Sequence, residues 1–156
     1  MMALHTNKDS AHIMHLIRKN TIGAEIGVWM GNTSTQFLKK GLKKFYMVDP
    51  YSVEPYKNSS EMTYQEWLAK YQPITGEIAE AGFQKFYERV WKEIKSRFEH
   101  MNEVELCRET SDSFFERYLA SKGHGNFEML DWIYIDGNHS YEQCIKDLKN
   151  ALNIVK

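Results

Sequence analysis

Short runs of β-branched and aromatic residues alternate along this chain with longer stretches in which apolar residues recur every three or four positions. The short runs show no polar alternation, which is typical of strands buried on both faces of a sheet. The longer stretches have the spacing of amphipathic helices. After a leading helix over 9–17, the pattern predicts strands over 21–28, 43–49, 104–109 and 129–136, and helices after them over 33–42, 78–100, 111–123 and 140–156.

Strands that alternate with helices predict a parallel sheet covered by helices on both faces, so the fold class is α/β. A length of 156 residues is typical of one domain, and we assign 1–156 to a single domain. The segment 52–78 has no clear period and holds Pro55 and Pro73. We interpret it as an insertion with a short helix near 60–71, and as a candidate substrate cover. We expect its aromatic residues either to stack on a substrate or to pack the segment onto the sheet. These residues are Tyr56, Tyr64, Trp67 and Tyr71.

The last predicted helix reaches Lys156, which leaves the fourth strand without a neighbour on its outer side. A long unpaired edge strand invites pairing with another chain. We therefore expect a fold that is truncated after the helix following the fourth strand. Self-association into a homo-oligomer through this edge follows as a hypothesis.

Charge and composition argue against several classes of partner. The chain has 20 basic and 21 acidic residues and a net charge of −1, so we expect no nucleic-acid partner. No apolar run approaches the roughly 20 residues of a membrane span, so we expect no membrane partner. Cys107 and Cys144 lack zinc-ligand spacing and are interpreted as reduced thiols. Together with the absence of a signal-peptide pattern, this predicts a cytoplasmic protein.

A turn with candidate ligand-binding residues follows the first predicted strand. Glu25 comes first, and Gly27 and Gly31 then flank Trp29 before the next helix begins. Glycines let the backbone approach a ligand closely, and a helix start offers free N–H groups. The spacing E-x-G-x-x-x-G differs from the G-x-G-x-x-G of dinucleotide-binding folds, and the wider loop leaves little room for a pyrophosphate.

Polar residues also follow the other three predicted strands. Asp49 ends the second strand, where a carboxylate can accept both hydroxyls of a ribose. The fourth strand ends at Asp136, and His139 follows across a Gly-Asn turn. The residues after the third strand can border an adenine; they are Thr110, Ser111 and Asp112. Because the carboxyl ends of parallel strands meet at one edge of the sheet, we predict that all these residues form one site.

Four segments in this order resemble the successive motifs of class I S-adenosylmethionine-dependent methyltransferases: GAEIGVWMGNTS, FYMVDPY, VELCRETSDSFF and LDWIYIDGNHSYEQCIKDL. The last segment contains D-G-x-H-x-Y, which is similar to the small-molecule and sugar O-methyltransferase branch. The resemblance spans nearly the whole chain except 52–78. It implies a Rossmann-like fold and S-adenosylmethionine as cofactor.

The resemblance also implies roles for individual residues. The cofactor-binding set is Glu25, Gly27, Trp29, Gly31, Asp49, Thr110, Ser111, Asp112 and Asp136. Asp136 matches an acid that binds Mg²⁺ in metal-dependent members and is also a catalytic candidate. His139 matches a histidine that acts as a base or contacts the substrate, and an imidazole with a pKa near neutral suits a general base. One carboxylate is not a magnesium site by itself, so the use of Mg²⁺ stays open.

The sequence is consistent with two functions. The first is methyl transfer from S-adenosylmethionine to a hydroxyl of a small molecule, such as a sugar or a glycosylated metabolite. The second is a non-catalytic or incomplete cofactor-binding domain that needs a partner chain or a missing C-terminal segment. A nicotinamide-dependent oxidoreductase is disfavoured because G-x-G-x-x-G is absent.

Overall fold

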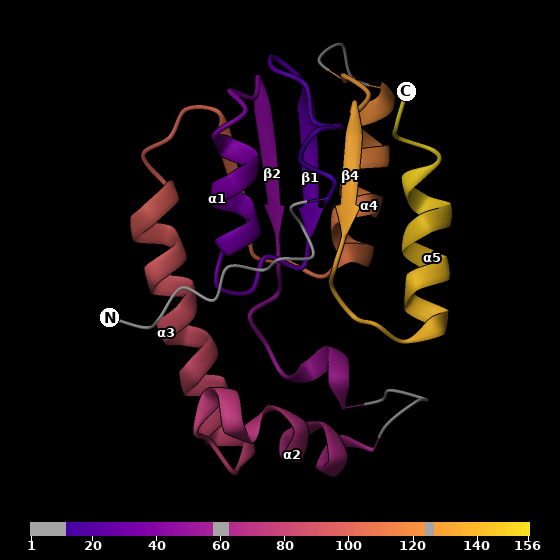
Figure 1. Ribbon diagram of the computed structural model, residues 1–156. Helices are drawn as coiled ribbons and strands as arrows, with labels where there is room; N and C mark the ends of the chain where they lie inside the picture. The colour runs from indigo at the N-terminus through magenta and orange to yellow at the C-terminus, as the bar shows by residue number, and fades with distance from the viewer. Residues whose placement is uncertain (1–11, 58–62, 124–126) are drawn as a thin grey trace.

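The computed structural model describes residues 12–57, 63–123 and 127–156, and its centre is a parallel sheet of four strands in the order β3-β2-β1-β4 (Figure 1). The chain therefore builds outward from β1 to β3 on one side and then places β4 on the other side of β1. This reversal is the topological switch point, where open α/β sheets bind ligands at the carboxyl ends of the strands. The strands are β1 (Ile22–Ile26), β2 (Lys44–Val48), β3 (Val104–Cys107) and β4 (Trp132–Ile135).

Helices cover both faces of the sheet, as the alternation of elements predicts (Figure 1). Because side chains alternate along a strand, Phe45 and Met47 point into one layer and Tyr46 and Val48 into the other. The first layer contains α1 and α3, and the second contains α4 and α5. The α/β fold of Rossmann-like type is therefore confirmed. The four helices are α1 (Asn32–Leu38), α3 (Glu80–Phe98), α4 (Ser111–Ala120) and α5 (Tyr141–Ala151).

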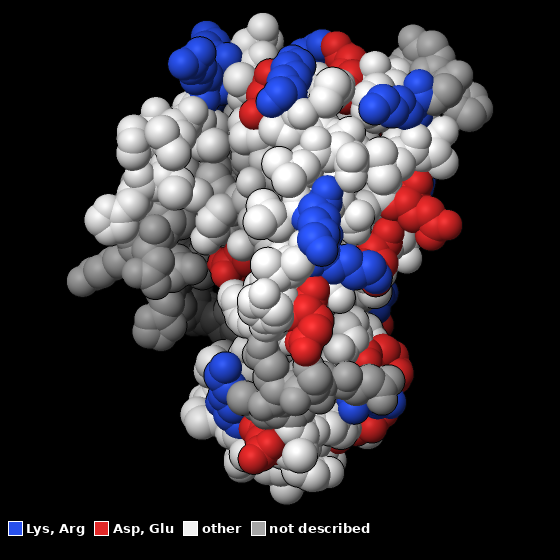
Figure 2. Space-filling view, turned by 90° about the vertical axis from the view of Figure 1, so that its right-hand side faces the viewer, with Lys and Arg blue, Asp and Glu red and all other residues white. Residues whose placement is uncertain are grey.

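Figure 2 shows the side of the molecule on which α5 lies. Basic and acidic side chains are interspersed there (Figure 2), in keeping with the net charge of −1. None of the helices among the described residues combines the length and the apolar character that a bilayer crossing requires.

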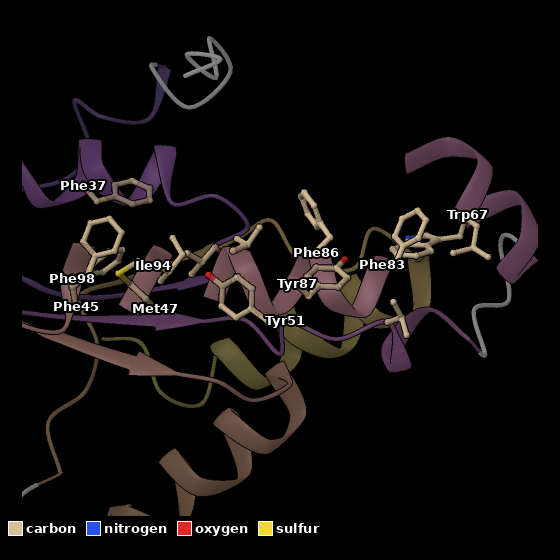
Figure 3. Close-up of a cluster of buried hydrophobic side chains, with 14 of the residues drawn as sticks. Phe37, Phe45, Met47, Tyr51, Trp67, Phe83, Phe86, Tyr87, Ile94 and Phe98 are labelled. Carbon is tan, nitrogen blue, oxygen red and sulfur yellow. The ribbon is translucent and has the colours of Figure 1, made fainter. Parts of the chain in front are cut away.

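The hydrophobic core of the α1–α3 layer continues past the sheet into the segment after β2 (Figure 3). Phe37, Phe45 and Phe98 lie at one end of this cluster, and Phe83 and Trp67 lie at the other. This second end belongs to α2 (Tyr64–Thr75) and to the first turns of α3, which extend beyond the carboxyl ends of the strands (Figure 1). A short 3₁₀ helix, η2 (Glu54–Tyr56), precedes α2.

Local capping explains where α2 begins and ends. Thr63 and Glu66 form a reciprocal capping box at its start, with the Thr63 N–H donating to Glu66 Oε2 over 2.8 Å. Gly76 ends the helix in the left-handed conformation at φ 73°. The short helix predicted near 60–71 therefore exists but begins and ends about one turn later, and 58–62 lie outside the described residues.

The leading helix predicted over 9–17 is not present in its described part. His12 is in a 3₁₀ conformation and residues 13–16 form turns, with a hydrogen bond of 2.9 Å from the Leu16 N–H to the Ile13 carbonyl; residues 9–11 lie outside the described ranges. Ile13 and Ile17 still pack against the core. A helix of about two turns has little intrinsic stability, so the few apolar contacts decide the conformation.

The end of the chain also differs from the prediction. Helix α5 stops at Ala151, and the following residues turn back toward the start of β4. Leu130 N–H donates to the Ile154 carbonyl over 2.8 Å, and Lys156 N–H donates to the Leu130 carbonyl over 2.9 Å. Ile154 is fully buried, and its burial in the α4–α5 layer explains why the helix does not continue to Lys156. The predicted truncation of the fold stays a prediction.

Candidate functional site

A cavity of about 1180 Å³ opens at the carboxyl ends of the strands, beside the switch point between β1 and β4. Small-molecule sites usually measure about 300–1,000 Å³, so this one has room for a cofactor together with an acceptor. Residues after all four strands contribute to its wall, as the sequence predicts. The predicted site residues that line it are Glu25, Gly27, Trp29, Asp49, Thr110, Ser111, Asp112, Asp136 and His139.

The Asp49 carboxylate accepts hydrogen bonds from the backbone of the turn between β1 and α1. Its Oδ2 accepts hydrogen bonds from the N–H groups of Val28, at 3.1 Å, and Trp29, at 2.9 Å. Its Oδ1 accepts a third from the Tyr51 N–H at 2.8 Å. Burial raises the pKa of Asp49, and the three backbone donors oppose that rise. Asp49 is therefore a structural part of the turn, a role that its position before a proline does not reveal.

Gly27 is required because another segment crosses directly over it. Its φ is +92°, and a Cβ at this position would lie 2.3 Å from the Asp136 carbonyl oxygen and 2.6 Å from Gly137 Cα. The backbone after β4 is thereby pressed against the turn after β1. This close approach brings Asp136 to the β1 side of the cavity.

Gly31 has a different surrounding from the one predicted. It is not among the residues that line the cavity. A Cβ on Gly31, whose φ is +71°, would lie 2.7 Å from Ile94 Cδ1 and 3.0 Å from Phe98 Cε2. The glycine therefore allows α1 to start against α3. The structure gives Gly31 a packing role, and the cofactor contact that the resemblance implies for it stays a prediction.

Glu25 is a buried carboxylate in the wall of the cavity. It is 1% exposed and accepts a hydrogen bond from the Ser34 hydroxyl. Burial raises the pKa of Glu25 well above its ordinary value, the charges of Asp136 and Asp49 add to this rise, and Ser34 opposes it. A carboxylate in such a place is stabilised in its charged form by a cation. Glu25 is therefore suited to the ammonium group of a ligand.

Asp136 and His139 lie close together at the mouth of the cavity. His139 Nε2 is 3.7 Å from Asp136 Oδ1, and the Tyr134 hydroxyl donates to Asp136 Oδ2 over 3.3 Å. The His139 side chain is 67% exposed, whereas that of Asp136 is 34% exposed. The exposed imidazole therefore lies at the rim of the cavity, with the more buried carboxylate beside it.

Polar residues at the start of α4 are hydrogen bonded to Gln143 on α5, a connection that the sequence did not predict. Thr110 caps α4 by accepting the Ser113 N–H at 3.3 Å. The Gln143 amide on α5 donates to Ser111 Oγ and Asp112 Oδ1, both at 3.2 Å. Gln143 also lines the cavity. No motif marks Gln143, because only the packing of α5 against α4 brings it to this wall.

Aromatic residues from the segment after β2 form the opposite wall. Tyr56 and Tyr71 line the cavity, and so does Tyr87 from α3, which the sequence did not single out. Burial raises the pKa of all three phenols, so they stay protonated. Trp67 is buried and stacks on Tyr56 with ring centroids 4.5 Å apart. Of the aromatic residues in the segment after β2, Tyr56 and Tyr71 therefore line the cavity, and Trp67 packs behind Tyr56.

The described residues contain no group of three or more His, Cys, Asp and Glu side chains that could hold a metal ion. The His139 imidazole lies 3.7 Å from Asp136, and hard divalent ions require several oxygen ligands. The residues described around Asp136 therefore do not fit the Mg²⁺ that the resemblance implies, and we assign no step to a metal.

Comparison with known families matches residues 24–156 to a family of methyltransferase domains. A solved structure of a protein from Streptococcus mutans, described as a candidate methyltransferase in complex with SAH, is similar over 100% of this chain and 69% of its own, with 13% identity and a TM-score of 0.45. A search among curated proteins gives no match.

Proposed function

Since the chain belongs to this family of methyltransferase domains, we propose that it transfers a methyl group from S-adenosylmethionine to a hydroxyl of a small molecule, such as a sugar or a glycosylated metabolite. The observation that supports this most is the cavity at the switch point, which has polar residues after all four strands in its wall. The proposal treats 1–156 as one methyltransferase domain, with 52–78 as its substrate cover.

The lining residues suit the three parts of the cofactor. Glu25 offers a buried carboxylate for the ammonium of the methionine part. Asp49 already accepts three backbone N–H groups, and a carboxylate has about four acceptor sites, so one remains for a ribose hydroxyl. Ser111, Asp112 and Gln143 provide donors and acceptors for an adenine edge. When bound, S-adenosylmethionine supplies a methyl group on a positively charged sulfur.

Methyl transfer breaks the bond between sulfur and the methyl carbon, whose electron pair stays on sulfur, and forms a bond from that carbon to the acceptor oxygen. The hydroxyl proton must leave at the same time, and His139 is the base that we assign to it. Asp136 Oδ1, 3.7 Å from His139 Nε2, attracts the imidazolium that forms when His139 takes this proton. Much of the acceleration comes from alignment of the two reactants by the cavity walls.

One observation favours the alternative, a cofactor-binding domain that is incomplete by itself. The His139 side chain is 67% exposed, whereas a base that is sequestered from water is more effective. In this alternative a partner chain or a further segment closes the acceptor side.

The test is an assay of S-adenosylhomocysteine release with a panel of hydroxylated acceptors, with product analysis for an O-methyl group. His139→Gln keeps a polar side chain but lacks a base of suitable pKa. We expect it to lower kcat by about a hundredfold or more while cofactor affinity is unchanged. Cofactor binding without transfer to any acceptor would favour the incomplete domain, and an unchanged kcat in His139→Gln would exclude His139 as the base.

A further inference from the structure

The charge of the cavity wall restricts the acceptor, and this inference rests on the proposed function. No lysine or arginine is among the described residues that line the cavity. Anionic substrates such as phosphate esters are usually held by lysine and arginine side chains. The lining carboxylates are Glu25, Asp49, Glu54, Asp112 and Asp136.

Two of these carboxylates form ion pairs with neighbouring lysines. Glu54 Oε1 lies 2.6 Å from Lys57 Nζ, and Asp112 Oδ2 lies 2.6 Å from Lys146 Nζ. Within the described ranges, the other three carboxylates form no ion pair with a lysine or arginine. The cavity therefore carries an excess of negative charge on the walls formed by β1, β2 and β4.

The cofactor does not remove this excess. S-adenosylmethionine has a sulfonium, an ammonium and a carboxylate, and hence one net positive charge. Burial raises the pKa of both Glu25 and Asp49, so Asp136, whose side chain is 34% exposed at the mouth, is the carboxylate that carries this excess on the acceptor side. A negative charge thus remains for the acceptor side, and an anionic acceptor would be repelled by it.

The position of this remaining charge is set by Asp136. Its side chain is 34% exposed, lies near His139, and is close enough to Tyr71 for its charge to raise the pKa of that phenol further. Tyr56, Tyr71 and Tyr87 line the same cavity, and the Tyr56 and Tyr87 side chains are hydrogen bonded to each other. A phenol oxygen can accept a hydrogen bond from an ammonium group. Carboxylate and phenol oxygens together form a wall that suits a cation.

We infer that the acceptor is a hydroxylated ring compound that carries a protonated amine, as an amino sugar does, and that phosphorylated or carboxylated acceptors are excluded. The amine is held by Asp136 and the phenol oxygens. The hydroxyl that receives the methyl group lies on the same ring, beside His139.

The test uses four sugars of similar size that differ in charge: glucosamine, glucose, glucuronate and glucose 6-phosphate. Each is titrated into the protein saturated with S-adenosylhomocysteine, and binding is followed by NMR. We expect glucosamine to bind about tenfold more tightly than glucose, and the two anionic sugars to show no saturable binding. Binding of S-adenosylhomocysteine is verified first. If the protein does not bind it, the proposed function fails, whereas a failure of the sugar titrations alone contradicts only the inference about the acceptor.

Two isosteric variants locate the charge. Asp136→Asn is expected to abolish the preference for glucosamine over glucose. Glu54→Gln, which removes a lining carboxylate that is 69% exposed and pairs with Lys57, is expected to keep it, because Asp136 is unchanged in this variant. Binding of glucuronate or glucose 6-phosphate as tight as that of glucosamine, no binding of glucosamine to the loaded protein, or an unchanged preference in Asp136→Asn would overturn the inference.

Discussion

Asp49 Oδ2 accepts the backbone N–H of Trp29 at 2.9 Å, which ties the end of β2 to the turn after β1. Trp29 has a φ of +50°, in the left-handed region that is unfavourable for a bulky residue. The Tyr51 hydroxyl donates to the Trp29 carbonyl over 3.1 Å and fixes the same residue from its other side. The turn that we assign to the cofactor is therefore held in a strained conformation before any ligand binds.

Asp49→Asn is expected to lower both stability and cofactor affinity. An asparagine side chain offers one acceptor oxygen, so its amide nitrogen faces either the Val28 and Trp29 N–H groups or that of Tyr51. The cost in unfolding free energy is about 1–3 kcal/mol. Thermal unfolding of the ligand-free protein measures it. An unchanged Tm combined with weaker cofactor binding would mean that Asp49 acts on the ribose alone.

Glu25→Gln is expected to stabilise the ligand-free protein and to weaken cofactor binding. Because burial raises the pKa of Glu25 above its ordinary 4.5, the folded state binds a proton more readily than the unfolded state. Stability from this group is therefore present at pH values below 4.5 and is lost as pH rises through the folded-state pKa. Glutamine has no such dependence. Urea unfolding at acidic and alkaline pH, with Glu54→Gln as control, tests this; a variant less stable than the native chain at alkaline pH would contradict it.

Arg97 ties α3 to the cofactor turn, and Arg97→Met is expected to lower affinity for S-adenosylhomocysteine. Its Nη1 donates to the Met30 carbonyl at 2.8 Å and its Nη2 to Thr35 Oγ1 at 3.0 Å. Methionine keeps the packing but loses both bonds, at a cost of about 1–3 kcal/mol. Arg89→Met, on an exposed part of the same helix, is the control and should change little. Equal affinities of the two variants would contradict the positioning role.

Gly27→Ala is expected to be far more damaging than Gly76→Ala. Both glycines have positive φ, +92° and +73°, so both substitutions carry a conformational penalty of about 1–2 kcal/mol. Only at Gly27 does the added Cβ meet backbone, the Asp136 carbonyl at 2.3 Å, whereas nothing lies within 4 Å at Gly76. Equilibrium unfolding of the two variants measures the difference. Similar losses would show that the segment after β4 does not rest on Gly27.

Elements with a long, regular pattern were predicted closely. Helix α3 was expected over 78–100 and is found at Glu80–Phe98, because its apolar stripe continues over five turns and fixes the buried face. The parallel topology also predicted that residues at the carboxyl ends of the strands lie at one edge of the sheet. Glu25, Asp49 and Asp136 do line one cavity there.

Residues whose role depends on contacts between distant elements were not predictable in this way. Gly31 carries the signal of a glycine turn, but only the packing of α3 shows that it faces Ile94. Tyr87 and Gln143 sit at ordinary helix positions, and their places in the cavity wall come from how α3 and α5 dock. The turn after α5 was missed because a continuous helical pattern does not reveal that Ile154 is buried beside Leu130.

The central claim, that this cavity binds S-adenosylmethionine, is tested most directly by calorimetric titration of the protein with S-adenosylhomocysteine, with NAD titrated alongside. The account predicts saturable binding of S-adenosylhomocysteine with a micromolar Kd, weakened in Asp49→Asn, and no binding of NAD. A folded protein that binds no S-adenosylhomocysteine, or that binds NAD with equal affinity, would contradict it.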